Sequence, residues 1–328
     1  MRLTERSAAM IIAVSHLVKT YVGKTPVRAV RDISFQVQRG EIFGFLGPNG
    51  AGKTTSIRCM LDVLRPTSGS IRIFELDSQQ DALAIHRRIG YLPGDVRLPG
   101  ELTAQQFLNR YARMAGSEPV LLPTLLERFD VPLNRKLKSF SKGMRQMVAV
   151  LQAFMCAPEL VILDEPTSGL DPLGQRAFNE FLLEQAQQGL TVFMSSHILS
   201  EVERICQRVA VIRAGELVAI EEIERLRERA GQVVIVAFVD VVSEAELRAI
   251  PGVQDVERQV NGAYHLKLAG SIDSMVKALA RHTIQRLEIE EAPLEDVFLR
   301  FYTGDGSNAP QRAAPVGAPV ATQEGKPA

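Results

Sequence analysis

The chain has 328 residues, which is enough for about two domains of ordinary size. Its 38 Lys and Arg balance its 38 Asp and Glu, and its hydrophobic fraction of 46% is typical of a globular protein with a buried core. Nucleic-acid-binding proteins usually carry a basic excess, so we expect no nucleic-acid partner. The three cysteines, Cys59, Cys156 and Cys206, are far apart, which favours buried thiols in a reducing compartment over a disulfide or a metal site.

The sequence shows no segment that would cross a membrane. No apolar run reaches the roughly 18 residues that a transmembrane helix requires. The start, MRLTERSAAMIIAV, lacks the long apolar segment and cleavage site of a signal peptide. We therefore expect a cytoplasmic location, and any work at a membrane requires a separate membrane-spanning chain.

The first two-thirds of the chain alternates predicted strands and helices. Strands are predicted at 11–19, 27–38, 41–46, 88–92, 160–163, 190–194, 208–213 and 216–220, and helices after Lys53 and within 103–128, 142–157, 172–188 and 198–206. The pair Ala214-Gly215 between the last two strands predicts a hairpin. Alternation of strands and helices predicts a largely parallel sheet with helices on its faces.

The pattern changes near residue 221. Residues 221–230 are strongly charged, and we interpret them as a solvated linker helix. The segments that follow are strands at 233–239, 253–259, 264–268 and 284–289 and helices at 244–249, 272–282 and 294–302. Their order, βαββαβ and a final helix, predicts a small ferredoxin-like domain. Residues 303–328 carry almost no large apolar side chain, so we expect them to be disordered.

One short segment points directly to a ligand. Between a predicted strand and a predicted helix the sequence reads GPNGAGKTT, which matches the phosphate-loop pattern G-x-x-x-x-G-K-[ST]. In this setting backbone N–H groups and a helix N-terminus face a phosphate. Lys53 should reach the β- and γ-phosphates of a nucleotide, and the hydroxyl of Thr54 should ligate Mg²⁺. The expected binding residues are Gly47, Pro48, Asn49, Gly50, Ala51, Gly52, Lys53, Thr54 and Thr55.

A second motif ends the apolar strand at 160–163. Two carboxylates, Asp164 and Glu165, follow it at the carboxyl edge of the predicted sheet, where ligands of parallel sheets bind. Asp164 can hold Mg²⁺ through water. Glu165 can accept a proton from an attacking water. The two motifs together therefore predict a metal position and a base position beside a bound nucleotide.

The order of further motifs resembles that of the ATP-binding cassette (ABC) ATPases. FSKGMRQ at 140–146 resembles the signature motif, SGLD at 168–171 the D-loop, and SSH at 195–197 the switch histidine. Tyr21 resembles the aromatic residue that stacks on adenine, although a half-buried aromatic at a strand end is the alternative. The resemblance covers about residues 13–220 and five ordered motifs.

The resemblance implies an α/β fold, a P-loop ABC ATPase cassette with a mixed sheet and a helical subdomain. The cassette would span 11–222, with the helical subdomain at about 95–158. A small α+β domain would follow at 223–302, and a tail at 303–328.

In this family each ATP is sandwiched between the phosphate loop of one subunit and the signature of another. The resemblance thus implies that Ser141, the expected N-cap of the helix at 142–157, and Gly143 face the γ-phosphate on a second cassette. His197 is implied to contact the γ-phosphate and to position the attacking water together with Glu165. Whether two copies of this chain pair, or two different cassettes, is left open.

Other nucleotide-binding classes fit the sequence less well. GTPases need a guanine-binding segment such as N-K-x-D, and chromosome ATPases split the two nucleotide motifs with a long coiled coil; this chain has neither. A single cassette is best interpreted as the motor subunit of a transporter, hydrolysing ATP with a separate transmembrane permease subunit on the inner face of the cell membrane. The segment EEAPLEDVFL at 290–299 resembles the ending of bacterial drug, antibiotic and lipid exporter subunits. The alternative is a non-transport ABC ATPase that regulates or remodels a complex.

One position departs from the family pattern. After the strand at 88–92 the family usually places a glutamine that reaches Mg²⁺ and the attacking water, whereas this chain has Gly94. Either the neighbouring Asp95 takes over as a ligand, or the contact is absent and the loop gains freedom. We favour the second interpretation, because a third carboxylate would add repulsion beside Asp164 and Glu165.

Overall fold

The computed structural model describes residues 10–295, 297 and 298, and these residues form three β-sheets. The helix predicted at 294–302 lies only partly within this range, and the tail at 303–328 lies outside it. Among the described residues, no helix is long and apolar enough to span a membrane.

The central sheet has six strands in the order β10-β9-β3-β8-β7-β6. They are β3 (Ile42–Leu46), β6 (Ile89–Leu92), β7 (Leu160–Asp164), β8 (Thr191–Ser196), β9 (Arg208–Arg213) and β10 (Glu216–Glu222). All neighbours are parallel except β9 and β10, which confirms the predicted largely parallel sheet and the hairpin. Leu46 pairs with Ser196, and Asp164 pairs with Ser195. The carboxyl ends of β3, β7 and β8 therefore lie side by side.

A second, antiparallel sheet covers one side of the central sheet. Its order is β2-β1-β4-β5, with β1 (Met10–Tyr21), β2 (Val27–Gln38), β4 (Ser68–Ile73) and β5 (Leu76–Asp77). The two sheets share one hydrophobic core, in which the ring of Phe35 lies 5.5–5.8 Å from those of Phe43, Phe45 and Phe193. Helix α1 (Lys53–Met60) belongs to this core, and the short α2 (Ala82–His86) follows β5.

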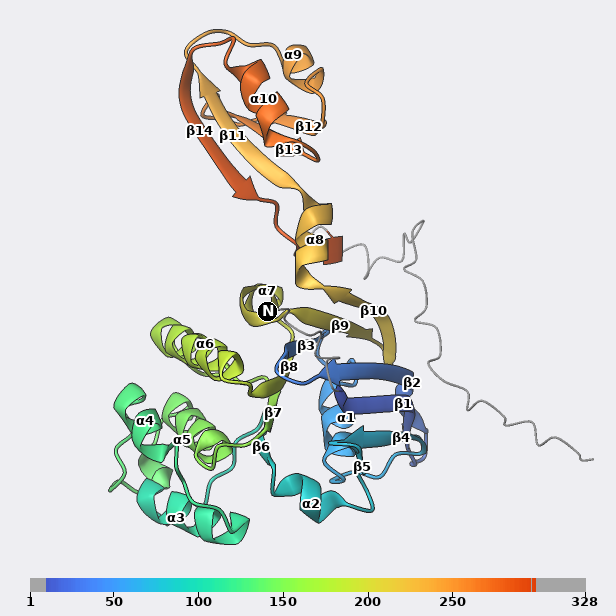
Figure 1. The fold of residues 1–328 in the computed structure, drawn as a ribbon, viewed down its shortest axis with the longest axis vertical. Coiled ribbons are helices and arrows are strands. Elements are labelled where there is room, and N and C mark those ends of the chain that lie inside the picture. The colour runs from blue at the N-terminus through green and yellow to red at the C-terminus, as the bar shows by residue number, and fades with distance from the viewer. Residues whose placement is uncertain (1–9, 296, 299–328) are drawn as a thin grey trace, which may run out of the picture.

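A group of helices lies on the opposite side of the central sheet (Figure 1). Its helices are α3 (Ala104–Ala115), α4 (Leu122–Arg128), the 3₁₀ turn Leu137–Ser139 and α5 (Lys142–Phe154). Thr103 and Gln106 form a reciprocal capping box at the start of α3, and Gly116 ends that helix with a φ of 65°. Helices α6 (Pro172–Gln187) and α7 (Leu199–Ile205) complete the same core.

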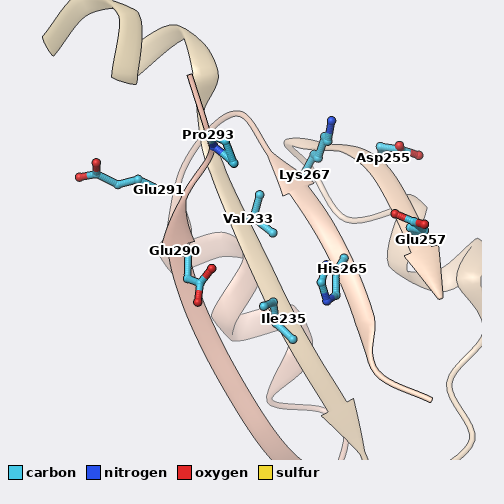
Figure 2. Close-up of a pocket in the computed structure, with 9 residues that line it drawn as sticks. All are labelled: Val233, Ile235, Asp255, Glu257, His265, Lys267, Glu290, Glu291 and Pro293. Atoms are coloured by element: carbon cyan, nitrogen blue, oxygen red, sulfur yellow. The ribbon is translucent and has the colours of Figure 1, made fainter. Parts of the chain in front are cut away.

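The third sheet belongs to the C-terminal part of the chain. Its elements are β11 (Gln232–Phe238), α9 (Glu244–Arg248), β12 (Val253–Arg258), β13 (Tyr264–Leu268), α10 (Ile272–Leu279) and β14 (Ile284–Glu291), with the sheet order β12-β13-β11-β14. The elements follow the order βαββαβ, and they enclose a core of their own. Figure 2 shows the face of this sheet opposite its helices, where Val233 and Ile235 lie between charged side chains.

The helix predicted at 221–230 is confirmed, but its interpretation as a solvated linker is wrong. The helix there, α8 (Ile223–Ala230), buries Ile223 and Leu226 in the core that contains α7. The segment is dominated by charged residues, but Ile223 and Leu226 are three positions apart and so lie on one face of the helix. Leu294 and Phe298 enter the same core, so residues on both sides of the C-terminal sheet pack against the helices of the first part of the chain.

Candidate functional site at the carboxyl edge of the central sheet

Residues 47–52 join β3 to α1 as a tightly packed loop, and residues 53–55 form the first turn of α1. A Cβ atom on Gly47 would lie 2.3 Å from the carbonyl oxygen of Ile212, and one on Gly52 would lie 2.6 Å from that of Ala29. Gly52 also has a φ of 110° and stands at the N-cap of α1 without a side-chain cap. Only glycine fits these positions, and the first backbone N–H groups of α1 are left for an anion.

The side chain of Lys53 folds back under this loop. Its side chain is only 5% exposed, and Nζ donates to the carbonyl oxygens of Gly47 at 2.7 Å and Pro48 at 3.3 Å. The same ammonium lies 3.3 Å from Oε1 of Glu165. A buried positive charge is thus fixed by the loop that carries it, where it can meet a phosphate.

Thr54 and Asp164 meet across the sheet edge as the sequence predicts. The Thr54 hydroxyl donates to Oδ2 of Asp164 at 2.8 Å, and the Ser195 hydroxyl donates to Oδ1 at 2.5 Å. The hydroxyl and the carboxylate are hard oxygen donors that suit Mg²⁺, which proteins usually hold with one or two carboxylates plus substrate phosphates. In the part of the chain that the structure describes, no group of three or more His, Cys, Asp or Glu would hold a metal alone.

Glu165 lies between the lysine and the histidine. Its Oε2 is 3.1 Å from Nδ1 of His197, and the side chains of Glu165 and His197 are 26% and 43% exposed. The backbone N–H of Glu165 donates to the carbonyl and hydroxyl oxygens of Ser195. Glu165 has a φ of 50°, in the left-handed region, which costs a non-glycine residue about 1–2 kcal/mol. The neighbouring strand therefore holds a strained turn that places a carboxylate at the mouth of the site.

Ser141 and Gly143 lie at the start of α5 and make contacts of a different kind. Ser141 is the N-cap, as predicted, and its hydroxyl accepts from the N–H of Met144 at 3.2 Å. A Cβ on Gly143 would lie 2.7 Å from the carbonyl oxygen of Gly169, so α5 and the SGLD segment approach backbone to backbone. Both residues thus shape an exposed helix start rather than the loop around Lys53.

Tyr21 lies at the other end of the phosphate loop. Its hydroxyl is 3.3 Å from Oγ1 of Thr55, its side chain is 39% exposed, and the Lys19 ammonium is 5.6 Å from the ring centre. An exposed aromatic face beside the loop is compatible with stacking on a base.

Gly94, which stands where the family usually has a glutamine, lies directly beside Asp164, the partner of Thr54. A Cβ on Gly94 would be 3.3 Å from Oδ2 of Asp164. The carboxylate of Asp95 is 72% exposed and pairs with Arg97 at 2.8 Å. Asp95 therefore forms an exposed ion pair with Arg97 at the surface.

Some polar residues of the site were not predicted from the sequence. Ser195 holds both Asp164 and Glu165, and the hydroxyls of Thr167 and Ser196 both donate to Glu201. The one available signal was a pair of serines at the end of an otherwise apolar strand.

Burial raises the pKa of a tyrosine near Asp164 and of a core cysteine on α1. The pKa of Tyr91 on β6 is raised to about 12, chiefly by burial and secondly by the negative charge of Asp164. Burial raises the pKa of the Cys59 thiol on α1 to about 11. Both groups stay protonated at neutral pH, so neither supplies a thiolate or a phenolate to the site.

Comparison with known proteins agrees with the family resemblance that the sequence motifs indicate. Residues 30–168 match the family model described as ABC transporter. The ABC transporter ATP-binding protein NatA of Bacillus subtilis is 36% identical over 212 residues, covering 62% of this chain and 86% of NatA. The linearmycin resistance ATP-binding protein LnrL of the same organism is 32% identical over 313 residues, covering 89% of this chain and 98% of LnrL.

Two further similarities bear on fold and role. Nod factor export ATP-binding protein I of Rhizobium johnstonii is 32% identical over 290 residues, covering 86% of this chain and 92% of that protein. A solved structure described as the ATP-binding subunit of an ABC transporter is 33% identical, with a TM-score of 0.62 over 67% of this chain and 92% of its own. This likeness confirms the P-loop cassette fold that the motif order implied.

Proposed function

The chain belongs to the family of ABC transporter ATP-binding proteins, and we propose that it is the ATP-hydrolysing motor subunit of an exporter. The observation that carries the proposal is the meeting of Lys53, Glu165 and His197 at one sheet edge, beside the pair of Thr54 and Asp164. A cation for phosphate, an oxygen pair for a metal and a carboxylate for a proton are what phosphoryl transfer to water requires.

The loop at 47–55 would hold the phosphates of ATP, with Lys53 at the β- and γ-phosphates and Tyr21 at the adenine. Thr54 and Asp164 would hold Mg²⁺, which when bound neutralises charge on the phosphates. Glu165 accepts the proton of the attacking water, and His197 keeps that carboxylate in position through its contact at 3.1 Å. Lys53, at 3.3 Å from Glu165, holds positive charge where negative charge develops.

We further propose that Ser141 and Gly143 serve the ATP held by a second cassette. The support is that the start of α5 presents backbone N–H groups at an exposed, capped helix end, whereas the phosphate loop is built from other elements. The proposed partners are therefore a second cassette and a separate transmembrane permease subunit, with the protein peripheral on the cytoplasmic side of the membrane. The proposed division is 11–222 for the cassette, with its helical subdomain at about 95–158, and 223–302 for the accessory domain.

Export rather than import is supported by the relatives. One is named for Nod factor export and another for linearmycin resistance, and both cover most of this chain, including residues beyond the cassette.

The experiment that tests the function is Glu165→Gln. The amide keeps the shape of the side chain and removes the proton acceptor, so turnover should fall about 10²–10⁴-fold while ATP still binds. Steady-state ATPase rates and binding of a fluorescent ATP analogue measure the two quantities, and an ATP-bound dimer should accumulate on a sizing column. Wild-type turnover by this variant would overturn the proposed base.

A further inference from the structure

A carboxylate on α7 joins the two segments that carry the proposed catalytic residues. Glu201 accepts a hydrogen bond from the Thr167 hydroxyl at 2.6 Å with Oε1, and from the Ser196 hydroxyl at 2.8 Å with Oε2. Both donors are buried, at 4% and 1% exposure. Each carboxylate oxygen therefore has a hydroxyl partner of its own: Thr167 lies in the loop after β7, and Ser196 is the last residue of β8.

Each donor is adjacent to a residue of the proposed mechanism. Ser196 directly precedes His197, and its hydroxyl also accepts from the backbone N–H of Ile198 at 2.9 Å, so the turn that carries the histidine is closed through Ser196. Thr167 lies two residues after Glu165. Glu201, Glu165 and His197 line one cavity, with Thr167 and Ser196 in its wall.

The same network reaches α5, here called the signature helix because it begins within the segment 140–146. Pro166, between Glu165 and Thr167, accepts a hydrogen bond at 2.8 Å from the side-chain amide of Gln146 on α5, and Gln146 is buried. Ser141 is the N-cap of α5. A chain of contacts thus runs from the histidine turn through Glu201 and the 165–167 segment to α5.

We propose that Glu201 is a positioning residue that holds His197 and Glu165 in register and ties them to the signature helix. The proposal rests on the proposed function, because it assigns roles to these residues in ATP hydrolysis. Both carboxylate oxygens of Glu201 are taken up by the hydroxyls of Thr167 and Ser196, so Glu201 acts through these neighbours. It fixes the turn at 196–198 relative to the loop after β7, and so it fixes the contact between His197 and Glu165.

The test is the ATPase activity of full-length Glu201→Ala, with Ser200→Ala as the matched control because Ser200 is exposed on the same turn of α7. Loss of positioning should lower kcat about 10- to 100-fold and leave KM for ATP within about threefold, because the phosphate loop is untouched. Glu201→Gln keeps the volume and one acceptor oxygen, so it should fold like the wild type and lose less activity than the alanine variant.

A double-mutant cycle separates positioning from a merely structural role. In a His197→Ala background, Glu201→Ala should cause little further loss of kcat, because its effect acts through the histidine. Full additivity of the two losses, or wild-type kcat in the folded Glu201→Ala protein, would overturn the proposal. If Glu165→Gln also retained wild-type turnover, the proposed function itself would have failed; if Glu165→Gln is inactive and Glu201→Ala is not, only this inference fails.

Discussion

At the scale of single residues, the site is organised around the carboxylate of Asp164. Hydroxyls from Thr54 and Ser195 occupy its two oxygens, and the backbone of Gly94 approaches it closely. A side chain at position 94 would begin 3.3 Å from this carboxylate, which is tighter than most real contacts. The glycine thus places no side chain beside Asp164, which leaves the neighbouring Asp95 as the residue whose role can be tested.

We expect Asp95→Ala to change the ATPase rate of the isolated subunit by less than tenfold, about 1.4 kcal/mol of barrier. The reason is that Asp95 is exposed and pairs with Arg97 rather than reaching inward. Arg97→Ala is the matched control, because it removes the other half of the same ion pair. A much larger loss in Asp95→Ala alone, rescued by raising the Mg²⁺ concentration, would show that Asp95 has taken the place of the missing glutamine.

The placement of the motif residues could be predicted because each has a fixed residue type at a fixed spacing, and their roles in hydrolysis stay predictions. Lys53, Thr54, Asp164, Glu165 and His197 all lie at the predicted sheet edge. Their hydroxyl partners could not be predicted in the same way. Serine and threonine are common at strand ends, and the pairing of Ser195 with Asp164 depends on the register between β7 and β8, which only the folded sheet defines.

At the scale of elements, three strands could be predicted to the residue from their pattern of apolar and β-branched residues. Strands β2, β9 and β13 begin and end at the predicted residues. The prediction omitted β4, whose sequence SGSIRI begins with small polar residues and has little strand character. Its place is set by pairing with β1, more than 50 residues earlier in the sequence. Long-range pairing can override local preference, so no local pattern marks such a strand.

The close contact between α5 and the SGLD segment predicts that adding one methyl group at Gly143 disturbs the start of α5. In Gly143→Ala the new Cβ would meet the carbonyl oxygen of Gly169 at 2.7 Å, so the start of α5 must shift. We expect ATP binding by the phosphate loop to stay within about threefold, because a site made of other elements is independent of this shift. ATPase turnover should fall at least about tenfold, because Ser141 moves with the helix.

Isothermal titration measures the binding and a coupled assay measures the turnover. Unchanged turnover in Gly143→Ala would mean that the start of α5 has no part in hydrolysis. Equal loss of binding and turnover would point instead to a general disturbance of the cassette.

At the scale of the whole molecule, α7 and α8 connect the site to the C-terminal sheet (Figure 1). Arg227 on α8 donates to the carbonyl oxygen of Glu203 on α7 at 2.9 Å and lies 3.5 Å from Glu291 at the end of β14. Leu226 packs in the cassette core beside this contact. The C-terminal sheet is therefore connected to the helix that carries Glu201, and α7 lies between the site and this C-terminal part of the chain.

The last prediction concerns the assembly, because the proposed ATP site is completed by a second chain. Lys53→Ala should disable the phosphate loop, and Ser141→Arg should block the signature with a bulky cation, so each homodimer should be almost inactive. If the chain pairs with itself, a mixed dimer contains one site with both defects and one site with neither. Random pairing of equal amounts then restores on the order of a quarter of wild-type turnover, since half of the dimers are mixed and each has one working site.

Subunit exchange is verified by pulling down differently tagged variants with ATP present. Recovery of activity supports a self-paired motor in which Lys53 and Ser141 act on one ATP from opposite chains. Exchange without recovery would show that the two residues do not share an ATP across a homodimer, and the second cassette would then have to be a different protein.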